Sequence, residues 1–170
     1  MKILLTLKEI EVEVNKLARL IKAPDNLLPT YGSSRDFAHP HLEVDQFQYH
    51  YVIIERGQEL DRKSTNNIQE LFYWIFNTVT FNLALQYELK NRIRNQDSRK
   101  IAFTKQEELL RVLNPEWSER KKEEHLEILK RHPFDDLSGL RATYCGELRR
   151  KGLSEPEVKK LAYEKYPKNE

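Results

Sequence analysis

The fold is decided by residues 42–65, which read LEVDQFQYHYVIIERGQELDRKST. The first four of these residues alternate between apolar and polar, as in a strand with one buried face. Residues 49–54 are apolar on both faces through the middle, which is typical of a central strand. Gly57 permits a tight reversal, and residues 59–65 return as a polar strand. The pattern predicts a three-stranded antiparallel meander with this polar strand at its edge.

Helices are predicted on both sides of the meander. Thr6 and Glu9 have the spacing of a capping box, and apolar residues recur every three or four positions from 7 to 21. Residues 68–91 are apolar on nearly every side, which predicts a helix buried as the spine of the core. Further helices are expected over 99–113 and 115–131 and on either side of residues 152–154. The fold class is α+β: an N-terminal helix, the meander, and a mainly helical C-terminal half packed on the sheet.

The composition indicates a folded and strongly charged chain. It has 170 residues, of which 33% are charged, with two Trp, eight Tyr and seven Phe. This length suits one core, so we expect a core domain over 1–134 and a short helical appendage over 135–170. The net charge of +2 indicates neither a dedicated nucleic-acid binder nor an acidic tail. A single cysteine, Cys145, excludes an internal disulfide and fits a reducing cytosol.

No targeting or membrane segment is predicted. The apolar run at the start is interrupted by Lys8, whereas a secretory signal needs about 7–15 apolar residues and a cleavage site. The most apolar later stretch, residues 71–85, is broken by polar side chains and is shorter than the roughly 20 residues that span a bilayer. We therefore expect a cytoplasmic protein without a membrane partner.

Two sets of side chains suggest alternative functions. His39, His41 and Asp45 could bind zinc with a water as fourth ligand, which would make the chain a small metal-dependent enzyme. The simpler interpretation is a loop that leads into a strand, and we predict no metal, no cofactor and no catalytic residues. Basic residues between Lys90 and Lys100 could contact nucleic acid. Basic residues near a helix end more ordinarily complement the helix dipole, so we do not expect a nucleic-acid partner.

A string of local sequence matches suggests a known family. The matching residues are Leu27 to Gly32, Arg35-Asp36, His39 to Val44, Tyr49 to Val52, Glu55 to Gly57 and Leu71 to Trp74. In this order they resemble the bacterial immunity protein 63 family of polymorphic toxin systems. The resemblance extends over about Leu7 to Phe134 and leaves the tail unplaced.

The resemblance implies a small cytosolic protein that binds one toxin and protects the cell that produces it. We expect a non-enzymatic, one-to-one complex that neutralises the toxin by steric occlusion. Seven residues are candidates for the partner-binding surface: Tyr31, Arg35, Asp36, Glu43, Asp45, Glu59 and Asp61. The last four are expected to project outward from the sheet, where carboxylates could imitate phosphates in front of a basic nuclease cleft. The alternative is that they form an ordinary solvated face.

Overall fold

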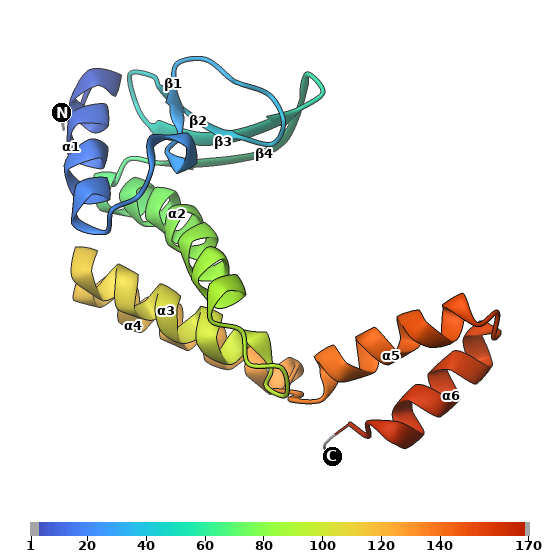
Figure 1. Cartoon of the computed structure of the whole chain (residues 1–170). Helices are drawn as coiled ribbons and strands as arrows, with labels where there is room; N and C mark the ends of the chain where they lie inside the picture. Colours follow the sequence, from blue (N-terminus) through green and yellow to red (C-terminus); the bar gives the residue numbers. More distant parts are fainter. Residues whose placement is uncertain (1–3, 169–170) are drawn as a thin grey trace. The chain divides into compact units, whose positions relative to one another are not determined.

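The computed structural model describes residues 4–168 and confirms the α+β class (Figure 1). The four helices predicted with bounds agree with the observed ones to within one residue at each end, and two further helices lie on either side of residues 152–154 as predicted. The elements are α1 (Leu7–Leu20), a 3-10 turn (Asp25–Leu27), β1 (Thr30–Tyr31), β2 (Pro40–Val44), β3 (Tyr49–Glu55), β4 (Gln58–Thr65), α2 (Ile68–Lys90), α3 (Ser98–Leu113), α4 (Pro115–Arg131), α5 (Ser138–Arg150) and α6 (Glu155–Lys165).

The sheet has four strands in the order β1-β2-β3-β4, one more than predicted. The additional strand, β1, pairs in parallel with β2, so that Thr30 lies opposite His41 and Tyr31 opposite Leu42. Its two residues are too few to show an alternating pattern, which is why the sequence did not reveal it. The N–H of Gly32 then donates to the carbonyl of Leu42 at 2.8 Å and ends the strand.

The meander itself is confirmed. β3 lies between β2 and β4 and pairs with both in antiparallel fashion. The polar strand β4 is at the edge of the sheet, and its residues are exposed except for Thr65, which is half-buried. A register shift between Ile53 and Ile54 marks a β-bulge in the β3–β4 pair. Charged side chains and a bulge both discourage a second chain from pairing with an edge strand.

Residues 4–83 and 108–119 form the first of two compact units. The buried face of α1, with Ile10 and Val14 fully inaccessible, packs in one apolar cluster with the sheet and α2. The Tyr51 hydroxyl on β3 lies 2.9 Å from the hydroxyl of Thr78 on α2, which ties sheet and helix together. Trp117 stacks on Phe76 with ring centroids 6.2 Å apart. The first part of α2 is therefore the central core helix that its sequence predicted.

Residues 84–107 and 120–168 form the second unit. In it α5 packs against α6, and the Tyr144 and Tyr166 rings meet edge to face at 6.0 Å. Asp135 and Arg141 form an ion pair at 2.6 Å that is largely buried. The boundary between the units lies within α2, α3 and α4. The predicted division into 1–134 and 135–170 concerns which part folds independently and stays a prediction.

Both predicted capping boxes are present. The N–H of Thr6 donates to the Glu9 carboxylate at 2.8 Å, and the Thr6 hydroxyl accepts from the N–H of Glu9 at 3.3 Å. The N–H of Ser154 donates likewise to the Glu157 carboxylate at 3.0 Å. Of the helices in residues 4–168, none combines the length and the apolar character needed to cross a bilayer.

Candidate partner-binding surface

The outer face of the sheet carries a chain of charged contacts. Nε2 of His41 lies 3.0 Å from Oε1 of Glu43, while Nη1 of Arg62 donates to Oε2 of the same carboxylate at 2.7 Å. Arg62 also donates to both carboxylate oxygens of Glu59, at 2.9 and 2.8 Å. The bonds from Arg62 are the main cause of the lowered pKa of Glu43 and of Glu59. Two of the predicted carboxylates therefore share one arginine, which offsets part of their negative charge.

Asp45 closes the turn between β2 and β3. Its Oδ1 accepts from the N–H groups of Phe47 and Gln48, each at 2.7 Å, and its Oδ2 lies 2.9 Å from Nε2 of His50. The backbone bond from Phe47 is the largest influence on the Asp45 carboxyl, and together these contacts lower its pKa to about 2. Asp45 thus has a structural task in the turn, and its carboxylate is held in a fixed direction.

The bulge in β4 separates two carboxylates that the sequence placed on one face. Glu59 lies opposite Ile54 and Asp61 opposite Ile53, so Leu60 is the additional residue between them. Ile53 packs against the core, and cross-strand partners share a face of the sheet. Glu59 therefore lies on the outer face with Arg62, whereas Asp61 lies on the side of the core. The expected outward direction holds for Glu59 and not for Asp61, because the bulge reverses the alternation.

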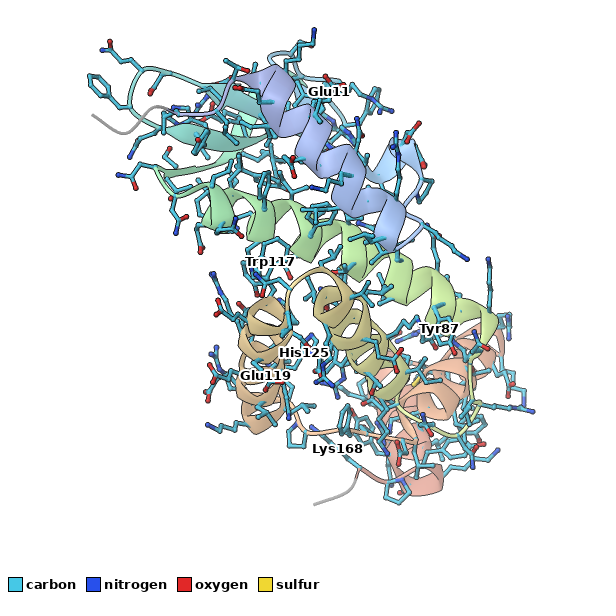
Figure 2. The ribbon with its side chains drawn as sticks, turned by 90° about the vertical axis from the view of Figure 1, so that its left-hand side faces the viewer. Glu11, Tyr87, Trp117, Glu119, His125 and Lys168 are labelled. Atoms are coloured by element: carbon cyan, nitrogen blue, oxygen red, sulfur yellow. The ribbon has the colours of Figure 1, made fainter. Side chains whose placement is uncertain are left out.

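Tyr31 lines a polar cleft of about 630 Å³ between α1 and the chain around β1. Its hydroxyl oxygen is shielded from solvent and has no hydrogen-bond partner within residues 4–168. Burial, and then the charge of Glu11, raise the pKa of Tyr31 well above its ordinary value. Figure 2 labels Glu11 on α1. The other polar side chains of the cleft belong to Glu11, Asn15, Arg19, Asp25, Thr30 and Ser33.

Arg35 and Asp36 lead into an unusual turn in the loop that joins β1 to β2. Asp36, Phe37 and Ala38 have φ angles of 60°, 57° and 56°, and the N–H of His39 donates to the carbonyl of Asp36 at 3.0 Å. These residues make one left-handed helical turn, which presents Phe37 with 89% of its surface exposed. Sequence reasoning missed Phe37, because Phe37 and Ala38 do not favour this conformation and a single aspartate before them does not signal a run of three.

The proposed zinc ligands do not come together. His39 Nε2 lies 2.8 Å from the carbonyl oxygen of Leu28, His41 contacts Glu43, and Asp45 contacts His50. Each candidate ligand thus has its own partner in a different place. Within residues 4–168, no group of three or more His, Cys, Asp or Glu side chains is arranged to hold a metal ion.

Three basic residues before and at the start of α3 form ion pairs. Arg92 donates to Glu88 at 2.7 Å, Arg99 to Asp97 at 2.7 Å, and Lys100 to Asp136 at 2.7 Å. Burial raises the pKa of Asp97, but bonds from the Arg99 side chain and the N–H of Asp135 outweigh it and bring the pKa to about 2. Arg99 and Lys100 hold the chain near residue 135 in place, and Arg92 pairs within its own segment, which gives all three a structural role that needs no nucleic acid.

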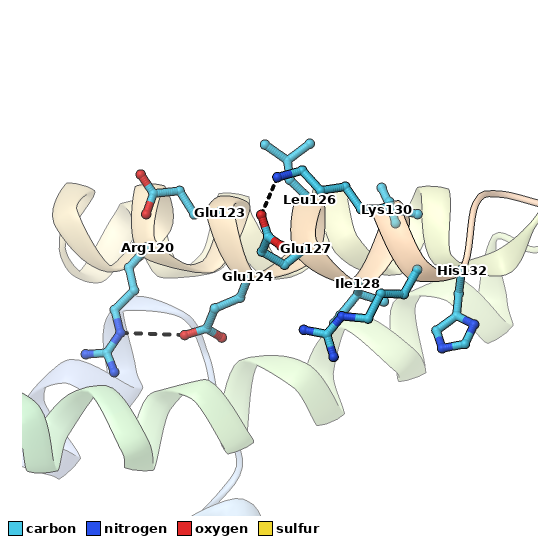
Figure 3. A pocket seen from close by; sticks show the side chains of 10 residues that line it. Arg120, Glu123, Glu124, Leu126, Glu127, Ile128, Lys130 and His132 are labelled. Carbon is cyan, nitrogen blue, oxygen red and sulfur yellow. Dashed lines mark hydrogen bonds and ion pairs between the residues drawn. The ribbon is translucent and has the colours of Figure 1, made fainter.

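A shallow groove of about 1080 Å³ lies along the C-terminal half of α4 (Figure 3). Leu126 and Ile128 are exposed there, beside ion pairs that join Arg120 to Glu124 and Lys130 to Glu127. Successive residues of one helix supply the lining. The groove therefore offers an open apolar strip with a charged border, and it has no convergent set of polar groups.

His125 is a buried histidine that sequence reasoning did not single out. Its ring stacks on Phe103 with centroids 3.8 Å apart, and Nδ1 lies 2.6 Å from a carboxylate oxygen of Glu107 (Figure 2). Nε2 lies 3.2 Å from Oε1 of Gln106. Burial lowers the pKa of His125, and the bond to Glu107 opposes this effect. The cluster joins α3 to α4 within the second unit.

Comparison with known proteins bears directly on function. Residues 45–127 match the family Immunity protein 63. The match supports the family suggested by the sequence, over a segment that runs from the β2–β3 turn through β3, β4, α2 and α3 into α4. Tyr49 to Val52, Glu55 to Gly57 and Leu71 to Trp74 lie inside the matched Immunity protein 63 segment, whereas the loop before β2 lies outside it. No curated protein and no solved structure matches the chain.

Proposed function

We propose that this chain is an immunity protein that binds a cognate toxin and neutralises it by steric occlusion. The match of residues 45–127 to Immunity protein 63 is the observation that carries the proposal. The complex is one-to-one and forms in the cytoplasm of the producing cell. The chain acts by covering the toxin and performs no catalysis of its own.

The first compact unit offers the binding surface in this proposal. It contains all seven candidate residues: Tyr31, Arg35, Asp36, Glu43, Asp45, Glu59 and Asp61. Ion pairs and turn hydrogen bonds hold Glu43, Asp45 and Glu59 in fixed positions before a partner arrives. A surface ordered in advance loses less conformational entropy on binding. An interface of about 1,600 Å² in total is the standard size for such a complex.

The proposed surface is not a simple imitation of phosphates. Arg62 lies between Glu43 and Glu59 and compensates one of their two charges. Electrostatic attraction to a basic cleft would therefore accelerate association less than four free carboxylates would. The proposal rests on shape and on a few anchoring side chains more than on total charge. Residues 135–170 act in it as an appendage outside the contact.

The test uses the product of the adjacent toxin-like gene, with its catalytic residues disabled, as bait. Isothermal titration calorimetry with the purified full-length chain should give a one-to-one complex, and the active toxin should lose access to its substrate when the complex forms. In cells, expression of the chain should restore growth in the presence of the active toxin. A toxin that stays active at saturating concentrations of this chain would reject occlusion as the mechanism.

A further inference from the structure

The left-handed turn at residues 36–38 is held against its local preference. For residues other than glycine, asparagine and aspartate, the left-handed helical conformation costs about 1–2 kcal/mol each, and residues in it normally occur singly. Here three follow one another, and two of them, Phe37 and Ala38, are of types that disfavour it. In addition, Oδ1 of Asp36 is shielded from solvent without a hydrogen-bond partner within residues 4–168. Backbone strain of this kind persists only where surrounding structure enforces it, and it is frequent at functional sites.

Hydrogen bonds to three separate segments enforce the turn. The N–H of Asp36 donates to the Ser34 hydroxyl at 2.9 Å, and the N–H of Ala38 donates to the carbonyl of Ile54 on β3 at 2.9 Å. Nε2 of His39 lies 2.8 Å from the carbonyl oxygen of Leu28. The turn is thus fastened before and after Phe37, so the phenyl ring projects from a fixed backbone.

A second exposed apolar side chain, Leu60, lies across the end of β3 from the turn. The contact between Ala38 and Ile54 brings the turn to one side of β3, and the bulge residue Leu60 follows Glu59, which faces Ile54 from the other side. Leu60 is 57% exposed. Phe37 and Leu60 therefore flank the end of β3 as two uncovered apolar side chains.

Two arginines near this pair form no ion pair in the described part of the chain, although acidic residues adjoin the pair as well: Asp36 precedes Phe37, and Glu59 and Asp61 flank Leu60. Arg35 precedes the turn, and Arg56 occupies the β3–β4 hairpin two residues after Ile54. Both are exposed, and within residues 4–168 neither forms an ion pair. Arg62, in contrast, is fully occupied by Glu43 and Glu59. Aromatic and arginine side chains are the residue types most enriched in the energetic centres of protein interfaces.

We propose that Phe37, presented by the strained turn and bordered by Arg35 and Arg56, is the anchor that inserts into the toxin. The partner surface is an apolar pocket wide enough for a phenyl ring, with carboxylates at its rim to meet the two arginines. The inference rests on the proposed function and adds the point of contact and its chemistry. The turn lies outside the matched segment, residues 45–127.

The experiment measures binding to the disabled product of the adjacent toxin-like gene by calorimetry and surface plasmon resonance. Phe37→Ala should raise Kd by about 30-fold or more, the effect of removing an interface hot spot. Phe47→Ala is the matched control, because Phe47 is also exposed, at 68%, but sits in the relaxed turn that Asp45 closes. It should change Kd by less than about twofold.

Two further variants test the charge and the strain. The double change Arg35→Gln and Arg56→Gln should slow association at low salt, and the difference should fade as salt is added. Ala38→Gly removes the steric penalty at φ 56° and keeps the turn, so it should stabilise the free protein and leave Kd within about twofold.

The outcomes separate the two proposals. If the unaltered chain binds the toxin and Phe37→Ala leaves Kd unchanged, Phe37 is not the anchor. The proposed immunity function would then still stand. An equal loss for Phe37→Ala and Phe47→Ala would overturn the anchor as well, because it would show a general apolar effect. Absence of binding by the unaltered chain would reject the proposed function itself.

Discussion

The N–H of Ala38 donates to the carbonyl of Ile54 across 2.9 Å and fastens a left-handed turn to the end of the central strand. This contact joins a loop outside the matched family segment to a strand inside it. It also explains how three consecutive residues keep positive φ angles without a glycine. A central strand can in this way hold a side chain of a neighbouring loop in a defined orientation.

The strain in this turn predicts a stabilising substitution. Ala38→Gly should raise the free energy of unfolding by about 1 kcal/mol, because glycine adopts φ near 56° without the steric penalty of a Cβ. Urea unfolding followed by circular dichroism measures the change. The same substitution at Ala142, an exposed position inside α5, should destabilise by about 1 kcal/mol and serves as the control. A loss of stability at both positions would show that the turn stores no strain.

The contacts of Arg62 predict a change in the titration of Glu43. Arg62→Gln removes the hydrogen bond that is the main cause of the lowered pKa, so the pKa of Glu43 should rise toward its ordinary value. Carbon-detected NMR of the side-chain carboxyl measures this shift directly. Lys63→Gln is the control, since Lys63 lies opposite Tyr51 on the core side of the sheet. A Glu43 pKa unaffected by Arg62→Gln would contradict the observed contact.

The buried pair in the second unit predicts a large loss of stability. Arg141→Ala leaves the Asp135 carboxylate without its partner, and removal of one member of a buried pair costs about 3 kcal/mol. Amide hydrogen exchange should accelerate in α5 and α6, because Arg141 also donates to the carbonyl of Tyr166. Arg149→Ala, which breaks an exposed pair with Glu155, should leave exchange nearly unchanged.

The same pair gives a pH dependence. The bond from Arg141 lowers the pKa of Asp135, so the folded state binds this proton less readily than the unfolded state. Its contribution to stability is present above the ordinary Asp pKa and is lost as the pH falls through the lowered value. Protection of α5 and α6 against exchange should therefore decline in acid. The Asp135→Asn variant should lack this part of the decline.

His125 predicts a second pH effect, at higher pH. Burial lowers its pKa, so the unfolded state takes up a proton first, at about pH 6.5, as the pH falls. Stability should decrease from there down to the lowered pKa of the folded state. Urea unfolding between pH 5 and 8 tests this, with His132→Gln as the exposed control. If His125→Gln retained the same pH dependence, another group would be responsible.

The sequence predicted those parts of the fold that depend on repeated patterns. The alternation in residues 42–54 predicted β2 and β3, and the apolar run in 68–91 predicted α2, because side-chain burial follows the period of the backbone. β1 was not predicted, because two residues are too few to show the alternation of buried and exposed side chains that marks a strand. The prediction that Glu59 and Asp61 project from the same face does not hold for a similar reason. The bulge residue Leu60 puts them on opposite faces, and nothing in the composition signals a bulge.

The candidate surface was harder to predict than the fold. The partners of Glu43 and Asp45, which are Arg62 and His50, come from other strands and depend on strand register. Phe37 could not be identified as a candidate from the sequence, because its exposure results from a backbone conformation that a run such as Asp36, Phe37 and Ala38 does not ordinarily adopt. Long-range hydrogen bonds decide both features, and local sequence does not encode them.

The immunity function is tested most directly by calorimetric titration of the purified chain with the disabled product of the adjacent toxin-like gene. We expect saturable one-to-one binding, together with loss of toxin activity at the same molar ratio. Absence of heat and of any complex by gel filtration at micromolar concentrations would contradict the immunity function. So would a complex in which the active toxin retains its full activity.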